Sequence, residues 1–159
     1  LKDSNKIKQR QTISNLIKQI QTINKQNQKA MATINNFEDL EIWQLAREIC
    51  QDIHRIINYD SFSKDFGLVK QINNSSGSVM DNIAEGFERE GNKEFRQFLF
   101  IAKGSCGECR SQLIRAYDRK YIKQDEFTII YNKRTTEGVK VKNFISYLSK
   151  SSVTGNKFK

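Results

Sequence analysis

The segment from Phe95 to Ala116 constrains the fold most, because its apolar and small residues alternate spacings of four and three over three heptads. The seam positions are Phe95, Leu99, Ala102, Cys106, Cys109, Leu113 and Ala116. This period places them on one side of an α-helix, which must pack against other helices along its whole length. The pattern predicts a long helix over about 92–120 within a helical bundle.

Three further stretches predict the other helices of that bundle. A seam of similar spacing predicts a helix over about 37–58, and it is formed by Ile42, Ala46, Ile49, Ile53 and Ile56. A second helix is expected over about 64–86. The last is expected over about 124–148, with a kink or local fraying at 135–138, where helix-forming residues are scarce. Short connections then predict the fold class: all-α, an antiparallel up-down-up-down four-helix bundle.

Two glycines bracket the predicted turn between the second and third helices. Gly86 is expected to end the second helix, since glycine tolerates the left-handed conformation that commonly closes helices. Gly91 or Asn92 is expected to cap the third helix, with Glu94 in its first turn, where a negative charge is favourable.

The bundle is expected to occupy residues 37–150 as one domain. Residues 1–36 are rich in lysine, asparagine and glutamine, and they are consistent either with a basic amphipathic helix or with a solvated arm. Residues 151–159 are expected to form a polar tail. No apolar run is long enough to span a membrane, and the first residues lack the apolar core of a signal peptide. We therefore expect a cytoplasmic protein without membrane contacts, whose three cysteines are reduced.

Charge is distributed unevenly along the chain, whose formal net charge is +9. Residues 1–36 carry a net +6, residues 37–91 a net −6 and residues 92–159 a net +9. Such a chain can present a positive face to a polyanion, or it can pair acidic and basic faces between subunits. Both uses are compatible with each other.

Cations recur every seven residues on the last two helices. Arg96, Lys103 and Arg110 do so on the third, and Lys133 and Lys140 on the fourth. A stripe with this spacing can follow a phosphate backbone, although an ordinary solvated helix face has the same appearance. The aromatics Phe98, Phe100 and Tyr117 could stack on bases, but their spacing is better explained by packing, within a subunit or between subunits.

The sequence offers little for catalysis, metal binding or cofactor binding. Cys106 and Cys109 have the spacing of a redox or metal motif, but they occupy seam positions in mid-helix, where a structural role is favoured. His54 is the only histidine, which excludes a di-iron site with two Glu-x-x-His motifs. We predict no catalytic residue, no metal site and no cofactor, and hence no enzyme.

Several separated motifs resemble one family. Phe37-Glu-Asp-Leu-Glu-Ile-Trp-Gln44, Asn82-Ile-Ala-Glu-Gly-Phe87, Lys93-Glu-Phe95 and Ile101-Ala-x-Gly-Ser105 resemble the signature of the small four-helix-bundle proteins encoded in intervening sequences of bacterial 23S ribosomal RNA genes. Accessory proteins of diversity-generating retroelements share that structural family. The resemblance covers residues 37 to about 148.

The resemblance implies a non-enzymatic homo-oligomer, a pentamer, whose basic surface associates with nucleic acid, with RNA preferred. In the retroelement branch it also implies a reverse transcriptase as partner. Carried over by position, the implied nucleic-acid-binding residues are Arg96, Lys103, Arg110, Arg115, Arg119, Lys133, Arg134 and Lys140.

The sequence departs from the family pattern in its second helix. Many members carry two arginines where Asn73 and Asn74 stand here, and a proline near Met80 or Asp81. The last two helices must then supply the basic surface. The alternatives are a protein-only oligomeric adaptor and, ranked last, a thiol redox or metal protein.

Overall fold

The computed structural model describes Asn15, residues 34–89 and residues 91–150. The predictions for the amino-terminal segment and for the tail fall almost entirely outside these residues. In the described part of the chain, a short 3-10 turn, η1 (Phe37–Asp39), precedes four α-helices and no strand is formed. The helices are α2 (Glu41–Ile57), α3 (Phe66–Glu88), α4 (Asn92–Asp118) and α5 (Gln124–Lys150).

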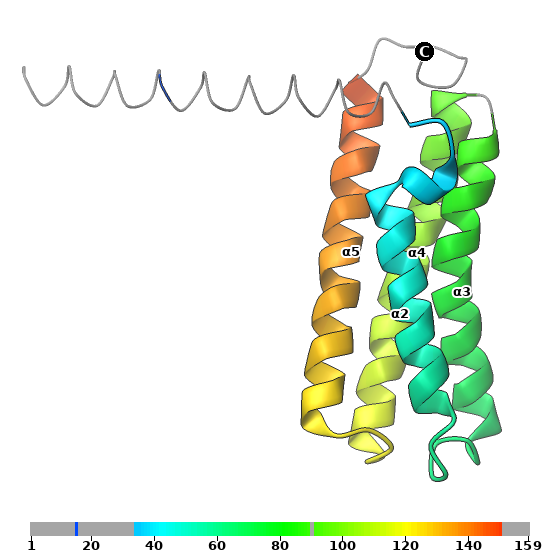
Figure 1. Ribbon diagram of the computed structural model, residues 1–159, viewed down its shortest axis with the longest axis vertical. Coiled ribbons are helices and arrows are strands. Elements are labelled where there is room, and N and C mark those ends of the chain that lie inside the picture. The colour runs from blue at the N-terminus through cyan, green and yellow to red at the C-terminus, as the bar shows by residue number, and fades with distance from the viewer. Residues whose placement is uncertain (1–14, 16–33, 90, 151–159) are drawn as a thin grey trace, which may run out of the picture. The chain divides into compact units, whose positions relative to one another are not determined.

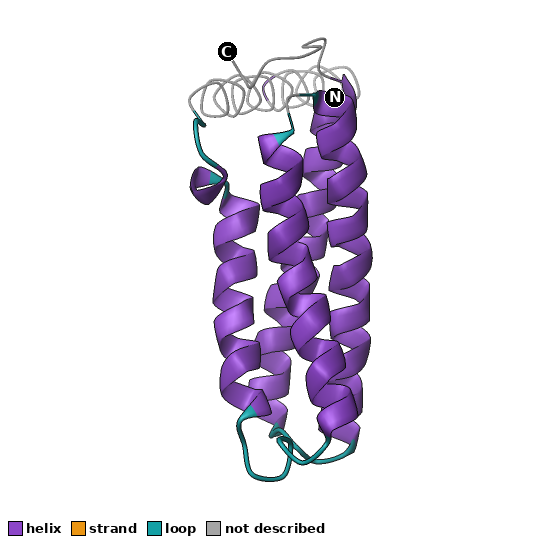
Figure 2. Ribbon diagram, turned by 90° about the vertical axis from the view of Figure 1, so that its right-hand side faces the viewer, coloured by secondary structure: helices purple, strands orange, loops and turns teal. Residues whose placement is uncertain are grey.

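The four helices lie side by side and alternate in direction, which confirms the predicted bundle (Figure 1). The loops that join α2 to α3 and α4 to α5 lie at one end, and the α3–α4 turn lies at the other (Figure 2). Helix α3 packs against α2 and α4, and α5 packs against α4 and α2. Among the described residues, no helix is both long and apolar enough to cross a membrane.

The predicted seams form the core. All seven seam residues of α4 are buried, as are the five isoleucine and alanine positions predicted for α2. Near the loop end the core is closed by Phe62, which is fully buried and stacks on Tyr121 at a ring-centroid distance of 5.1 Å. Burial of these apolar faces is the main favourable contribution to folding.

The expected role of Gly86 is wrong. Helix α3 continues through Gly86 to Glu88, and the glycine does not adopt a left-handed φ. A Cβ atom at this position would lie 2.6 Å from Cβ of Phe98 and 2.8 Å from Cδ2 of Phe95, both on α4. Glycine is therefore needed here so that α3 and α4 can approach closely. Gly91, by contrast, is the N-cap of α4 with Glu94 in its first turn, as predicted.

The local fraying that the sequence predicts at 135–138, as the alternative to a kink, is also absent, since α5 is helical without interruption over Gln124–Lys150. Thr135 donates a hydrogen bond from its hydroxyl to the carbonyl of Tyr131, at 2.8 Å. Glu137 is fully buried, and Gly138 packs beside Cys106 of α4. Tertiary packing thus overrides the low helix propensity of this stretch.

Candidate nucleic-acid interface

Three of the predicted cations lie along the side of α4 that faces α5. Arg96, Lys103 and Arg110 share one angular position, because a seven-residue step is close to two helical turns. Tyr117 continues this row and stacks on Phe127 of α5 at 4.7 Å, while the guanidinium of Arg110 lies 6.0 Å from the ring centre of Tyr131. We call Arg96, Lys103 and Arg110 the basic shoulder.

The basic shoulder is not neutralised within the described part of the chain. None of its three side chains forms an ion pair with a carboxylate there. Lys103 is exposed, whereas the two arginines are half-buried and their Nε atoms have no hydrogen-bond partner. The partly buried stems hold the arginines along the boundary between α4 and α5, and the three charges are left available to an anion.

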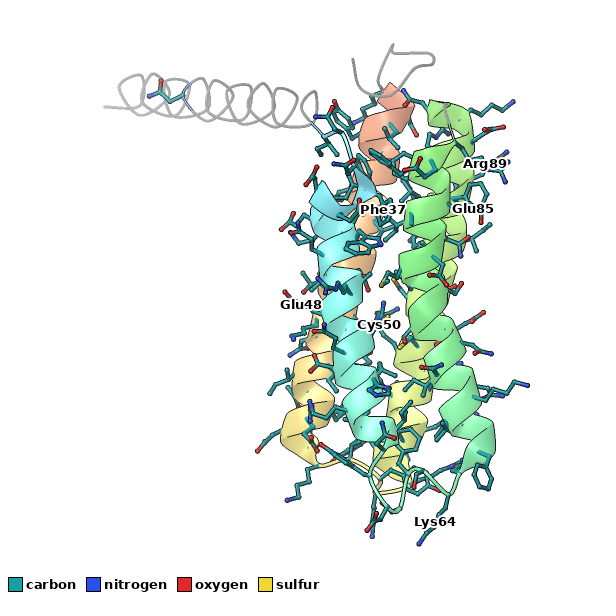
Figure 3. All side chains as sticks on the ribbon, turned by 45° about the vertical axis from the view of Figure 1, so that its right-hand side comes forward. Phe37, Glu48, Cys50, Lys64, Glu85 and Arg89 are labelled. Atoms are coloured by element: carbon teal, nitrogen blue, oxygen red, sulfur yellow. The ribbon has the colours of Figure 1, made fainter. Side chains whose placement is uncertain are left out.

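The predicted cations of α5 are used differently. Nζ of Lys133 lies 2.9 Å from Oδ2 of Asp52 and 3.8 Å from Oε2 of Glu48, both on α2. Nζ of Lys140 lies 2.6 Å from Oε1 of Glu41, on the same helix. Glu48 projects from the opposite side of α2 to Cys50, which faces α3 (Figure 3). Part of the charge asymmetry of the sequence is therefore paired between α2 and α5 inside one subunit.

A further ion pair joins α2 and α5 nearer the loops. Nη1 of Arg55 lies 2.7 Å from Oε1 of Glu126, and the hydroxyl of Tyr59 donates to the same oxygen at 2.5 Å. The hydrogen bond from Tyr59, followed by that from Arg55, lowers the pKa of Glu126. The lowered pKa favours the ionised carboxylate, which pairs α5 with the end of α2.

Two other predicted arginines contact α3 rather than solvent alone. Arg115 donates to Oε1 of Gln71 at 2.5 Å, and Arg119 forms an ion pair with Asp65, the N-cap of α3. Backbone donation from Leu68, aided by Arg119 and Tyr121, lowers the pKa of Asp65. Arg119 is thereby partly neutralised, whereas Arg115 keeps its charge.

Arg134 is a correction to the predicted site, because its side chain is fully buried in the bundle. Its Nη1 donates to Oε2 of Glu137, which is also fully buried, so Arg134 cannot reach a phosphate in this fold. Both residues continue the apolar seam of α5 between Ile130 and Val141 at four-three spacing. Arg134 therefore belongs to the core, and it is removed from the candidate surface.

The buried pair lies in a polar layer to which all four helices contribute. Cys106 lies 3.6 Å from Oε2 of Glu137, and Ser75 donates to Oε1 of Gln112 at 2.5 Å. Burial, reinforced by the nearby Glu137 carboxylate, raises the pKa of Cys106 to about 12. Burial also raises the pKa of Cys109. Because the reactive form of cysteine is the thiolate, these thiols are chemically quiet at neutral pH.

The cysteines do not form a metal centre with their neighbours in the described residues, where no group of three or more potential ligands is suitably arranged. All three thiols are free. Cys50 is half-buried on α2 and donates to the carbonyl of Ser76, at 3.3 Å. The geometry is that of small core residues, in line with the structural role expected from the sequence.

Packing, within a subunit or between subunits, is the interpretation of three aromatics of α4, and the described chain shows it within the subunit for two of them. Phe98 does pack, because it lies against Gly86 and the guanidinium of Arg89 sits 5.4 Å from its ring centre. Tyr117 packs on Phe127. Phe100, however, is 53% exposed, one turn from both Arg96 and Lys103. Its position outside the four-three seam was the signal in the sequence.

Comparisons with known proteins agree on the fold. The family model described as 23S rRNA-intervening sequence protein matches residues 38–143. Among solved structures, a protein of unknown function from the S23 ribosomal protein family of Bacteroides thetaiotaomicron is similar, with a TM-score of 0.62 and 23% identity. The similarity covers 65% of this chain and 97% of that chain. Comparison with curated proteins gives no match. Because the family model spans the whole bundle except the end of its last helix, the chain belongs to the 23S rRNA-intervening sequence protein family.

Proposed function

We propose that this protein is a non-enzymatic, oligomeric scaffold that binds nucleic acid, RNA in particular, through the basic shoulder of α4. The observation that supports the proposal is that cations with the same seven-residue spacing are paired with carboxylates on α5 but not on α4. Those of α5 are paired with carboxylates of α2, while Arg96, Lys103 and Arg110 lack such partners in the described chain. Unpaired cations in a row are suited to phosphates along one nucleic-acid backbone.

The shoulder has the dimensions of a backbone-binding element. Seven residues advance about 10.5 Å along an α-helix, so the three charges span about 21 Å. Three neutralised phosphates give a slope of log affinity against log salt of about −2 to −3. Such binding by one subunit is weak, and repetition of the shoulder in an oligomer would strengthen it through avidity.

The outward face of α5 is our candidate for the contact between subunits. Ile129 and Val139 are 56% and 53% exposed, and the residues between them on this face, Asn132 and Thr136, are uncharged and exposed. An uncharged, partly apolar helix face is unusual on so charged a chain and is suited to a partner helix. We propose a homo-oligomer assembled through this face, with the pentamer of related proteins as its form.

The family resemblance adds a possible biological setting for the scaffold. We propose the reverse transcriptase of a diversity-generating retroelement as its protein partner, with the scaffold as accessory subunit. Three free cysteines are compatible with a reducing compartment, and the proposal places the protein in the cytoplasm.

Two triple variants test the nucleic-acid proposal at equal change in net charge. Arg96, Lys103 and Arg110 are replaced by glutamine in one, and Arg119, Lys133 and Lys140 in the other. Binding to a fluorescein-labelled RNA hairpin and to a matched DNA duplex is measured by anisotropy at 50 mM salt. The first variant should lose at least tenfold more affinity than the second. Equal losses would show that only net charge matters, and that the shoulder is not a site.

A protein-only adaptor is the second candidate, and the exposed apolar residues of α5 favour it. Light scattering after size exclusion tests assembly of wild type, Ile129→Glu and Val139→Glu. Phe66→Glu is the control, because Phe66 is 80% exposed but lies on α3. Assembly that depends on α5, together with no RNA binding at low salt, would establish the adaptor and refute the nucleic-acid proposal.

A further inference from the structure

The outward face of α4 carries an exposed aromatic ring inside the row of unpaired cations. Phe100 follows Arg96 by four residues and precedes Lys103 by three, so it sits beside the shoulder between its first two charges. The ring is 53% exposed, and no aromatic neighbour packs on it among the described residues. A large aromatic side chain that is exposed and has no aromatic packing partner in the described chain indicates a contact with a ligand or partner.

Two glycines lie on the surface just beyond Phe100. Gly104 and Gly107 lie on the same outward side of α4, and apart from the chain neighbours and the backbone of α4 itself, a Cβ atom built at either would meet no atom within 4 Å. A planar group stacked on Phe100 could therefore continue along the helix over these two glycines. Exposed Ser111 follows on the same face, and Ile114, which is 40% exposed, ends the strip.

The two flanks of this strip differ in charge. The basic shoulder borders it on the side of α5, whereas the side of α3 carries exposed Glu94 and Glu108 together with Arg115. A polyanion that covered the whole face would meet these carboxylates. A ligand with its anionic groups along one edge and flat, uncharged groups along the other would avoid them.

We infer that α4 binds a single-stranded nucleic-acid segment, with phosphates on Arg96, Lys103 and Arg110 and one base stacked on Phe100. This inference rests on the proposed function and specifies its ligand. Single strands expose their base faces, which duplexes keep stacked internally, and cationic grooves with aromatic platforms are the usual means of binding them. Stacking tolerates every base, so no sequence preference is expected.

The length of the shoulder sets the size of the segment. A span of about 21 Å corresponds to about six nucleotides at roughly 3.4 Å per stacked nucleotide, and to fewer if the strand is extended. Oligonucleotides of six or more nucleotides should bind with similar affinity per site, while trinucleotides should bind much more weakly.

The test compares labelled U12 and a 12-base-pair RNA duplex, titrated by anisotropy with full-length protein at several salt concentrations. The variants are Phe100→Ala, Phe100→Trp, Lys103→Gln and, as control on the same strip, Ile114→Ala. Phe100→Ala should weaken U12 binding about tenfold or more, with an unchanged salt slope. Phe100→Trp should retain it, and Ile114→Ala should change it less than threefold. Lys103→Gln should reduce the salt slope by about 0.7.

The possible failures separate the two proposals. Unchanged U12 binding by Phe100→Ala, with weaker binding by Lys103→Gln, would refute base stacking and leave the proposed function intact. Preference for the duplex would also refute the inference alone. No salt-dependent binding by the wild type to either RNA would refute both. Loss of self-association in Phe100→Ala, measured by sedimentation, would identify the face as a contact between copies and overturn the inference.

Discussion

Replacement of Gly86 by alanine should destabilise the bundle, although the same change in an ordinary helix position stabilises it. The added methyl carbon would lie 2.6 Å from Cβ of Phe98, about 1 Å closer than the optimal carbon–carbon separation. Cβ of Phe98 is fixed to the backbone of α4 and cannot rotate away. Helices α3 and α4 must therefore separate locally, along the interface that the α4 seam occupies.

The expected magnitude combines two opposing contributions. Alanine improves helix propensity over glycine by about 1 kcal/mol, while overpacking in a close-packed core typically costs about 1–3 kcal/mol. The contact at Gly86 lies at the severe end of that range because it involves a Cβ atom and not the end of a flexible chain. We expect a net loss of about 1–2 kcal/mol in the free energy of unfolding.

Gly77 of the same helix supplies the matched control. Its nearest foreign atom to a built Cβ is Oδ2 of Asp81, at 3.9 Å, which is ordinary contact. Gly77→Ala should stabilise the protein by about 0.5–1 kcal/mol. Urea unfolding followed by circular dichroism at 222 nm measures both variants. If Gly86→Ala is as stable as Gly77→Ala, the close approach of α3 and α4 is not what requires glycine at this position.

Three further changes test the core and the end of α4. Arg134→Met leaves the Glu137 carboxylate buried without a cation, so the free energy of unfolding measured in urea should fall by about 3–5 kcal/mol. Adding Glu137→Leu to this variant should recover most of that loss. Lys120 follows the end of α4 in a left-handed conformation, with φ 61°, and the backbone N–H of Tyr121 donates to the carbonyl of Ala116 at 3.0 Å. Lys120→Gly should therefore raise the melting temperature, because it removes about 1 kcal/mol of backbone strain. For Cys106 the folded pKa of about 12 exceeds the ordinary 9.0, so the folded state keeps a proton that the unfolded state loses, and stability should fall as pH rises from 9 to 12. Cys106→Ala should flatten that alkaline decline in thermal melts.

The bundle could be predicted from the sequence because its helices are strongly periodic. The α4 seam repeats over three heptads, and this local signal determines which side of the helix is buried. The position of Arg134 was predictable by the same count, since it follows Ile130 by four residues and precedes Val141 by seven. Its charge led to the wrong assignment, because a buried arginine requires a partner that only the fold identifies, here Glu137.

The other features that the sequence does not reveal concern contacts between distant segments. The spacing of Lys133 and Lys140 resembles that of the α4 cations, and no local pattern distinguishes them. Only the adjacency of α2 and α5 shows that Glu41 and Asp52 neutralise the lysines. Glycine likewise has two common uses in helical proteins, a left-handed cap and a close helix contact, and the neighbouring helix decides between them.

The central claim is that three unpaired cations of α4 contact phosphates, and the salt dependence of RNA binding tests it most directly. The slope of log affinity against log salt should be about −2 or steeper per engaged subunit in the wild type. In the variant with Arg96, Lys103 and Arg110 replaced by glutamine, the slope should become shallower by about 2. An identical slope in the two proteins, both folded by circular dichroism, would contradict the claim and show that the α4 cations do not contact phosphates.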